Sequence, residues 1–228
     1  PSNGWAQRQL AFVLLQRGDG DGAAEVASNA VRVDPNNPRV YETLGDIERR
    51  RDRLEQAQCA YRRAIELSAD SSYGIEKLVA TGASSEERRE LLQFIKHELV
   101  NQITHGEGLA GYYNSARNVL EPATLAAELE EAWLARPDLW QTWSVTAEHF
   151  AETVSLESAQ LRIDQALSRF PLVARLWLDK AHIFELRGEL EQEREALQHA
   201  LQIAPHWSLA LRRLADSLER SGLYEKSR

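Results

Sequence analysis

Apolar residues along the chain recur at intervals of three and four, the spacing that places side chains on one face of an α-helix. Two stretches show this spacing clearly: Leu176, Trp177, Ala181 and Phe184, and then Leu197, Ala200, Leu201 and Ala204. The apolar–polar alternation expected of a half-buried strand is not sustained anywhere. The pattern therefore predicts an all-α fold.

The helical pattern repeats along the chain with a step of 34 residues. One position of the repeat is alanine in every unit except the third, where Glu98 takes its place. The alanines are Ala30, Ala64, Ala132, Ala166 and Ala200. A second position, five residues later, is proline in four units: Pro35, Pro137, Pro171 and Pro205. The register holds from residue 4 onward without an insertion, which predicts helical hairpins of one length.

This pattern follows from the packing of two antiparallel helices in each unit. Small side chains let two helix backbones approach, and larger apolar side chains fill the space between adjacent helices. A proline after the second helix stops it and begins the next loop. We therefore expect small residues such as Gly45 and Ala64 to lie where helices cross.

The clearest unit resembles a tetratricopeptide repeat. The residues that carry the resemblance are Tyr41, Leu44, Gly45, Ala57, Tyr61 and Ala64. The resemblance implies a right-handed α-solenoid of antiparallel helix pairs, a superhelix of about 13 helices. It also implies a non-catalytic scaffold that binds a protein or peptide segment in a concave groove lined by the first helix of each pair.

We predict one tetratricopeptide-like array over residues 1–228. Its repeats start near residues 4, 38, 72, 106, 140 and 174, and a closing helix covers 208–222. The repeats in 72–139 are degenerate, since Glu98 replaces alanine and Tyr112 and Tyr113 stand at crowded positions. We expect looser packing there. Ser84 to Glu87 forms a capping box, which predicts a helix from near Ser85 to about Thr104.

Composition and charge limit the classes of partner that the chain is expected to bind. The chain has 27 Lys plus Arg against 35 Asp plus Glu, a formal charge of −8, which argues against nucleic acid and anionic membranes. No apolar run reaches the roughly 18 to 20 residues of a membrane span. One cysteine, Cys59, cannot form an internal disulfide, and we expect it to fill space inside a helix pair. The compartment stays unassigned, with the cytoplasm favoured.

The sequence contains partial matches to cofactor-binding and metalloprotease motifs, but the residues around each match exclude the corresponding site. Residues 106–111 match the dinucleotide-binding fingerprint, but no strand precedes them, so a loop and the first turn of a helix are expected instead. His97-Glu98 begins a zinc-protease motif, but Asn101 occupies the second histidine position. We predict no catalytic residue, no metal site, no cofactor and no enzymatic activity.

The predicted binding surface consists of first-helix positions left outside the helix pairing. It is basic in its first half, with Arg39, Arg49, Arg50, Lys77, Asn114 and Arg117. It is acidic in its second half, with Glu148, Asp179 and His182. This polarity favours a protein or peptide of complementary charge order, whose identity the sequence does not give.

Two alternatives stay open. The chain lacks an initial methionine and ends at Arg228, short of a second helix, so we expect a segment of a longer protein. That protein would be an enzyme, such as a glycosyltransferase or a protease, that recruits substrates through these repeats. The second alternative is a self-assembly module, because apolar residues of the closing helix, such as Leu211, would recruit another copy and form a homo-oligomer.

Overall fold

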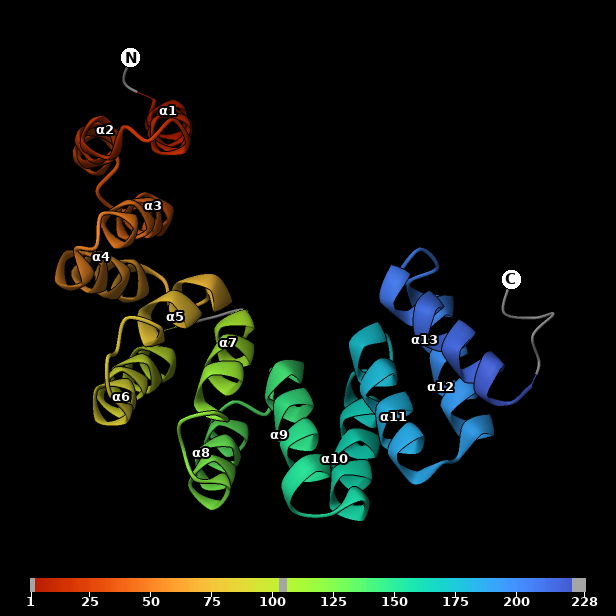
Figure 1. The fold of residues 1–228 in the computed structure, drawn as a ribbon. Helices are drawn as coiled ribbons and strands as arrows, with labels where there is room; N and C mark the ends of the chain where they lie inside the picture. The colour runs from red at the N-terminus through yellow and green to blue at the C-terminus, as the bar shows by residue number, and fades with distance from the viewer. Residues whose placement is uncertain (1–2, 103–105, 223–228) are drawn as a thin grey trace. The chain divides into compact units, whose positions relative to one another are not determined.

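The computed structural model describes residues 3–102 and 106–222, and it has thirteen helices and no strand within them (Figure 1). The helices are α1 (Gly4–Gln16), α2 (Gly20–Val33), α3 (Pro38–Arg50), α4 (Leu54–Leu67), α5 (Ser72–Val79), α6 (Ser85–Asn101), α7 (Glu107–Ala116), α8 (Pro122–Ala135), α9 (Trp140–Thr153), α10 (Leu156–Arg169), α11 (Ala174–Arg187), α12 (Leu190–Ile203) and α13 (Ser208–Arg220). The prediction of an all-α fold with about 13 helices is confirmed.

The chain divides into two compact units, one up to Glu121 and one from Pro122 onward, and each is described by itself. In the first unit α1 pairs with α2 and α3 with α4. In the second unit α9 pairs with α10 and α11 with α12. The single continuous array over 1–228 stays a prediction.

Helix starts in the first unit follow from local capping. The side chain of Asn37 accepts from the N–H of Arg39 at 3.0 Å, and Pro38 stands in the first turn of α3. Ser84 Oγ accepts from the N–H of Glu87 at 3.1 Å, while Glu87 Oε2 accepts from the N–H of Ala83 at 2.7 Å. The predicted cap at Ser84 and the start of α6 at Ser85 are thus confirmed, while the return bond from Glu87 reaches Ala83, one residue before the cap. The helix ends at Asn101, where Gln102 has an extended backbone, and so ends before the predicted Thr104, which lies outside the described residues.

Small residues lie where helices cross, as the 34-residue pattern predicts. A Cβ added to Gly45 would lie 2.6 Å from Cε1 of the buried Tyr61, so only glycine fits between α3 and α4 there. The repeated alanines Ala30, Ala64, Ala166 and Ala200 are buried, and Ala132 is half-buried. Cys59, in contrast, is exposed, so the prediction that it fills a helix pair was wrong.

The third and fourth repeats meet in a close contact, but within the third repeat α5 packs far less extensively against α6 than α3 does against α4, as the expectation of looser packing predicts. The eight-residue α5 packs more extensively against α7 than against α6. A Cβ on Gly108 would lie 2.0 Å from the carbonyl oxygen of Ala69, and one on Gly111 would lie 2.5 Å from Cα of Ser72. The glycines of the 106–111 motif therefore permit a close helix contact, and Gly106 precedes α7 with a left-handed φ of 89°.

The first aromatic position of the repeat makes one recurring hydrogen bond. Tyr41 Oη donates to the carbonyl oxygen of Pro35 at 3.1 Å. The indole nitrogens of Trp143 and Trp177 donate to the carbonyl oxygens of Pro137 and Pro171, each at 3.0 Å. An aromatic donor six residues after the proline thus ties the start of α3, α9 and α11 to the preceding loop.

The second unit buries a cation among aromatic rings. The guanidinium carbon of Arg162 lies 3.7 Å from the ring centroid of Trp133, and the side chain is only 11% exposed. Trp133 in turn meets Trp143 edge to face at 5.1 Å between centroids. Burial lowers the pKa of Arg162, and the carboxylate of Glu130 at 3.4 Å opposes that shift. The sequence pattern did not predict this stack of α8, α9 and α10.

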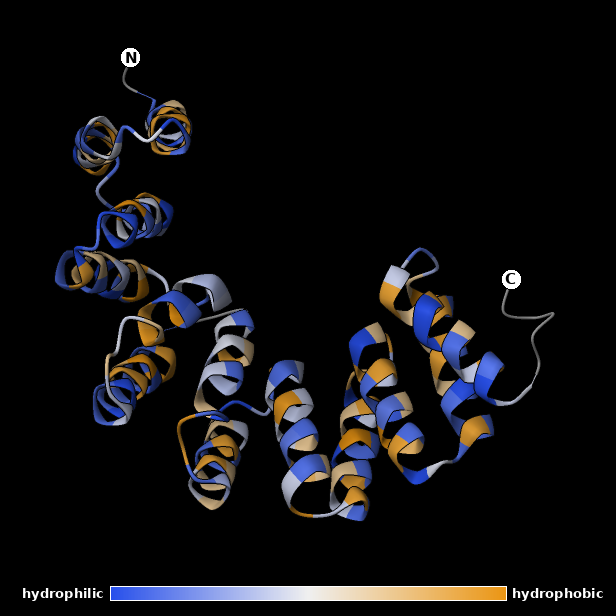
Figure 2. Ribbon diagram, viewed as in Figure 1, coloured by the Kyte–Doolittle hydropathy of each residue, from blue (hydrophilic) through white to orange (hydrophobic). Residues whose placement is uncertain are grey.

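Each helix carries both polar and apolar residues around its circumference (Figure 2). Among the described residues, no helix is long and apolar enough to cross a membrane.

A buried carboxylate links α12 to α13 and makes stability depend on pH. Glu193 is 2% exposed, and its Oε1 accepts from the guanidinium of Arg220 at 2.5 Å. Burial raises the pKa of Glu193 above its usual value, although the charge of Arg220 opposes this. The folded state therefore binds this proton more tightly than the unfolded chain does.

We expect Glu193→Gln to be more stable than the original chain at neutral pH, with an advantage that shrinks as pH falls. A raised pKa means that the ionised form of Glu193 destabilises the fold above that pKa, and protonation removes the penalty. Urea unfolding at several pH values between 4 and 7.5 measures the difference. An advantage that is constant over this range would contradict the prediction, and Glu195→Gln, at an exposed position of α12, is the control.

Candidate functional site

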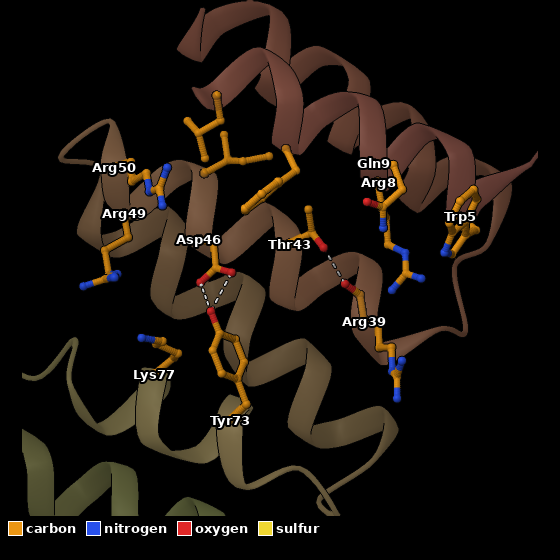
Figure 3. A pocket seen from close by; sticks show the side chains of 13 residues that line it. Trp5, Arg8, Gln9, Arg39, Thr43, Asp46, Arg49, Arg50, Tyr73 and Lys77 are labelled. Atoms are coloured by element: carbon orange, nitrogen blue, oxygen red, sulfur yellow. Dashed lines mark hydrogen bonds between the residues drawn. The ribbon is translucent and has the colours of Figure 1, made fainter. Parts of the chain in front are cut away.

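A hollow lies within the first unit, between the first helices of three successive pairs (Figure 3). It encloses about 500 Å³. We call it the α1–α3–α5 groove. Its lining residues are Trp5, Arg8, Gln9, Phe12, Leu15, Arg39, Thr43, Asp46, Ile47, Arg49, Arg50, Tyr73 and Lys77.

Five of these residues are cations, and none makes an ion pair within the described ranges. Arg39, Arg49 and Arg50 are exposed on α3, while Arg8 on α1 and Lys77 on α5 are half-buried. Nζ of Lys77 lies 5.1 Å from the ring centroid of Tyr73, a cation–π contact. The groove therefore presents five positive charges that make no ion pair among the described residues.

The carboxylate among the lining residues, Asp46, is held by two phenols. Tyr61 Oη donates to Asp46 Oδ1 at 2.7 Å, and Tyr73 Oη donates to Oδ2 at 2.7 Å (Figure 3). Burial, and then the hydrogen bond to Asp46, raise the pKa of both tyrosines, so they stay protonated donors. The carboxylate is thereby fixed on the floor of the groove.

A neighbouring hollow continues the groove toward the loop before α5, and it adds two further acids. Glu42 Oε1 accepts from Ser71 Oγ at 2.6 Å. Asp70 Oδ1 accepts from the N–H of Gly108 at 3.0 Å. Five cations against three carboxylates leave the combined surface basic, with the acids engaged in bonds that hold the fold.

Aromatic rings are exposed beside these cations. Trp5 is 61% exposed, Phe12 47% and Tyr73 46%. Aromatic side chains that are this exposed can pack against apolar groups of a ligand. The groove combines such rings with arginines, and both residue types are enriched where proteins bind one another.

The groove brings four of the predicted binding residues together: Arg39, Arg49, Arg50 and Lys77. It does not include Asn114 and Arg117, which lie exposed on α7 and at its C-terminal end, where Arg117 stands 5.4 Å from the ring of Tyr113. The prediction missed Trp5, Arg8, Phe12 and Tyr73 as groove residues. Their signal was present, because they occupy positions 2, 5, 9 and 2 of their repeats, which are positions left outside the pairing.

The predicted acidic residues line a smaller hollow of about 120 Å³ in the second unit. Arg175 pairs with Glu148 at 3.5 Å and with Asp179 at 2.7 Å, and Asp179 also accepts from Ser144 Oγ at 2.5 Å. Nδ1 of His182 lies 3.1 Å from Glu185. Charge is present here, but it is largely paired within the unit.

Within the part of the chain that the structure describes, no three His, Cys, Asp or Glu side chains gather in a way that would hold a metal ion. Nε2 of His97 lies 3.0 Å from the amide nitrogen of Asn101, one turn later on α6. His105 lies outside the described residues.

Comparison with known families identifies the repeats. Models described as tetratricopeptide repeat match residues 4–47, 38–71 and 147–206. The chain is a tetratricopeptide repeat protein. Such repeats generally mediate protein–protein interaction, and none of these models is a catalytic domain.

One curated relative of this tetratricopeptide repeat protein is cellulose synthase operon protein C of Xanthomonas axonopodis pv. citri (strain 306). It is 23% identical over 204 residues, which cover 87% of this chain and 11% of that protein. The chain therefore spans about a tenth of the relative's length.

Two solved structures are similar in fold. YrrB, described as a tetratricopeptide repeat protein with an unusual peptide-binding site, is 16% identical, with 82% of this chain and 97% of that chain covered and a TM-score of 0.46. TTC0263 of Thermus thermophilus, a thermophilic tetratricopeptide repeat protein, is also 16% identical, with 95% and 100% covered and a TM-score of 0.47.

Proposed function

We propose that the chain is a non-catalytic interaction module that binds a peptide segment of another protein in the α1–α3–α5 groove. The observation that carries the proposal is the set of five groove cations without an ion pair among the described residues, next to exposed rings. Helix pairs hold these side chains on a rigid surface, so a peptide would not have to order the site when it binds.

Selection from a display library of random twelve-residue peptides tests this function. We expect the intact chain to enrich peptides that contain Asp and Glu together with an apolar residue. A library that yields no enrichment over background would exclude peptide binding in this groove.

We expect the double variant Arg49→Glu, Arg50→Glu to bind a selected peptide about tenfold more weakly or worse, which corresponds to about 1.4 kcal/mol. Each reversal removes an attraction of about 0.2–1 kcal/mol and introduces a repulsion of similar size. Fluorescence anisotropy of the labelled peptide at low salt measures the effect.

The matched control is Arg32→Glu, which reverses an exposed arginine on α2, outside the groove. Its affinity for the same peptide should equal that of the original chain. Equal weakening by the groove and control variants would reduce the effect to net charge and contradict the assigned site.

A second candidate is a recruiting segment inside a longer protein. The match to 11% of a cellulose synthase operon protein favours it, and the bound partner would then belong to a polysaccharide-synthesising assembly. The complete reading frame and its neighbouring genes test this candidate. A frame of this length alone, with no synthase gene nearby, would remove it.

Self-assembly is the remaining candidate, since Leu211 on α13 is 47% exposed. Light scattering over a hundredfold range of concentration tests it. A monomer mass throughout contradicts self-assembly, and a mass that rises with concentration supports it.

A further inference from the structure

The cations of the α1–α3–α5 groove form two groups rather than one. Arg8 and Arg39 lie together near Trp5, whereas Arg49, Arg50 and Lys77 lie at the opposite end (Figure 3). Arg39 and Arg49 are ten residues apart on α3, so their Cα atoms are separated by about 15 Å along the helix axis. A ligand that satisfies both groups must carry negative charge at two places.

The floor between the two groups does not suit an acidic group. Asp46 stands there with its two phenol donors, and Thr43 donates its hydroxyl to the carbonyl oxygen of Arg39 at 2.9 Å. A second carboxylate placed over Asp46 would be repelled. The middle of the ligand is therefore expected to be uncharged.

The wall formed by α1 adds apolar surface from the end that holds Arg8 and Arg39 toward the middle. Trp5 and Phe12 are seven residues apart, close to two helical turns, so they project from the same side of α1 with about 10 Å between them. Both rings are exposed beside the groove. Trp5 therefore offers apolar surface beside the first cation group, and Phe12 offers it two turns farther along α1.

The distance between the two cation groups favours an extended ligand over a helical one. A helix rises 1.5 Å per residue and would need about ten residues to cross 15 Å. Fixing that longer segment on binding costs more conformational entropy. An extended peptide rises about 3.3 Å per residue, so it crosses the 15 Å between the cation groups in about five residues.

We propose that the groove recognises an extended protein segment with two acidic clusters centred about five residues apart and an uncharged, partly apolar stretch between them. This inference rests on the proposed function, and it adds the charge spacing of the partner. The net charge of −8 disfavours a nucleic acid as the ligand in spite of the basic groove.

Three labelled peptides of equal length and composition test the spacing on the unmodified chain. Each contains two Glu-Glu pairs, separated by three residues with one leucine in the first peptide, by none in the second and by seven in the third. We expect the first peptide to bind at least tenfold more tightly than the other two by fluorescence anisotropy. Equal binding of all three would overturn the spacing while leaving peptide binding intact.

Charge exchange tests which cation group meets which acidic pair. Two further peptides carry Lys-Lys in place of either the first or the second Glu-Glu pair. One of them should restore binding to Arg39→Glu, and the other should restore binding to Arg49→Glu, Arg50→Glu. Rescue of both variants by the same peptide would overturn the two-group arrangement.

Two controls test whether a loss of binding comes from unfolding of a variant and whether the groove binds any polyanion. Far-UV circular dichroism should show unchanged helix content for both variants, and the three-peptide comparison needs no variant at all. A twelve-residue oligothymidylate that binds as tightly as the first peptide would overturn the choice of a protein partner. Failure of the peptide library, in contrast, would remove the proposed function itself.

Discussion

Replacing Gly108 by alanine is expected to lower the free energy of unfolding of the first unit by more than about 3 kcal/mol. The new Cβ would lie 2.0 Å from the carbonyl oxygen of Ala69 and 2.8 Å from Cδ2 of Leu99. Backbone cannot swing aside as a flexible side chain does, so α7 must move away from α5. That movement would also break the bond from the N–H of Gly108 to Asp70.

Urea unfolding followed by circular dichroism measures this loss. The matched control is Gly20→Ala, also near the start of a helix, where the new Cβ meets only the flexible side chain of Arg51 at 3.3 Å. Alanine there should be neutral or slightly stabilising, since it has the higher helix propensity. A Gly108 variant as stable as this control would show that α7 does not approach α5 closely.

Replacing Trp143 by alanine is expected to destabilise the second unit by about 3–5 kcal/mol, the usual cost of deleting a large buried aromatic side chain. Trp143 is 7% exposed and belongs to the core that α9 forms with α10 and α11. Its loss would leave a cavity beside Trp133, and the hydrogen bond to Pro137 would disappear. Thermal and urea unfolding measure the change.

The variant Trp143→Phe separates packing from the hydrogen bond. Phenylalanine keeps an aromatic ring in the core but has no N–H, so the carbonyl oxygen of Pro137 loses its donor. We expect this variant to retain most of the stability that alanine loses, with the missing bond costing about 1 kcal/mol. An equally large loss in both variants would show that the hydrogen bond, and not the ring, dominates.

The helices follow from the sequence where local chemistry decides them. Asn37, Pro38 and Ser84 are capping signals whose effect acts within one turn, and the spacing of Gly45 and Tyr61 reports a contact inside one hairpin. Such features depend on residues close in the chain. They are therefore visible as a pattern before any coordinates.

Contacts between non-adjacent helices were harder to predict. Gly108 and Gly111 were explained as a loop and a first helical turn, whereas their role is to admit the backbone of residues 69–72. The stack of Arg162 on Trp133 joins α10 to α8, and the repeat pattern does not predict a contact between these two residues. In each case the deciding partner lies more than 25 residues away and outside the repeat pattern.

The candidate site could be predicted only in part. The position in the repeat places four cations on the surface of the groove: Arg39, Arg49, Arg50 and Lys77. It does not tell which charged residues form ion pairs with one another. Only the structure distinguishes Arg49, which has no ion pair among the described residues, from Arg175, which holds two carboxylates. The sequence alone therefore overstates the negative charge that the acidic half offers to a ligand, because Asp179 already accepts two hydrogen bonds within the fold.

The bond from an aromatic donor to a proline carbonyl connects α3, α9 and α11 to the loops that precede them. The segment 140–173 carries the donor Trp143 near its start and the acceptor Pro171 near its end. Because the acceptor is a main-chain oxygen, the following hairpin needs only Tyr or Trp at the matching place. A duplication of the segment 140–173 would thus carry both the donor and the acceptor with it, so this connection would form again without a compensating substitution elsewhere.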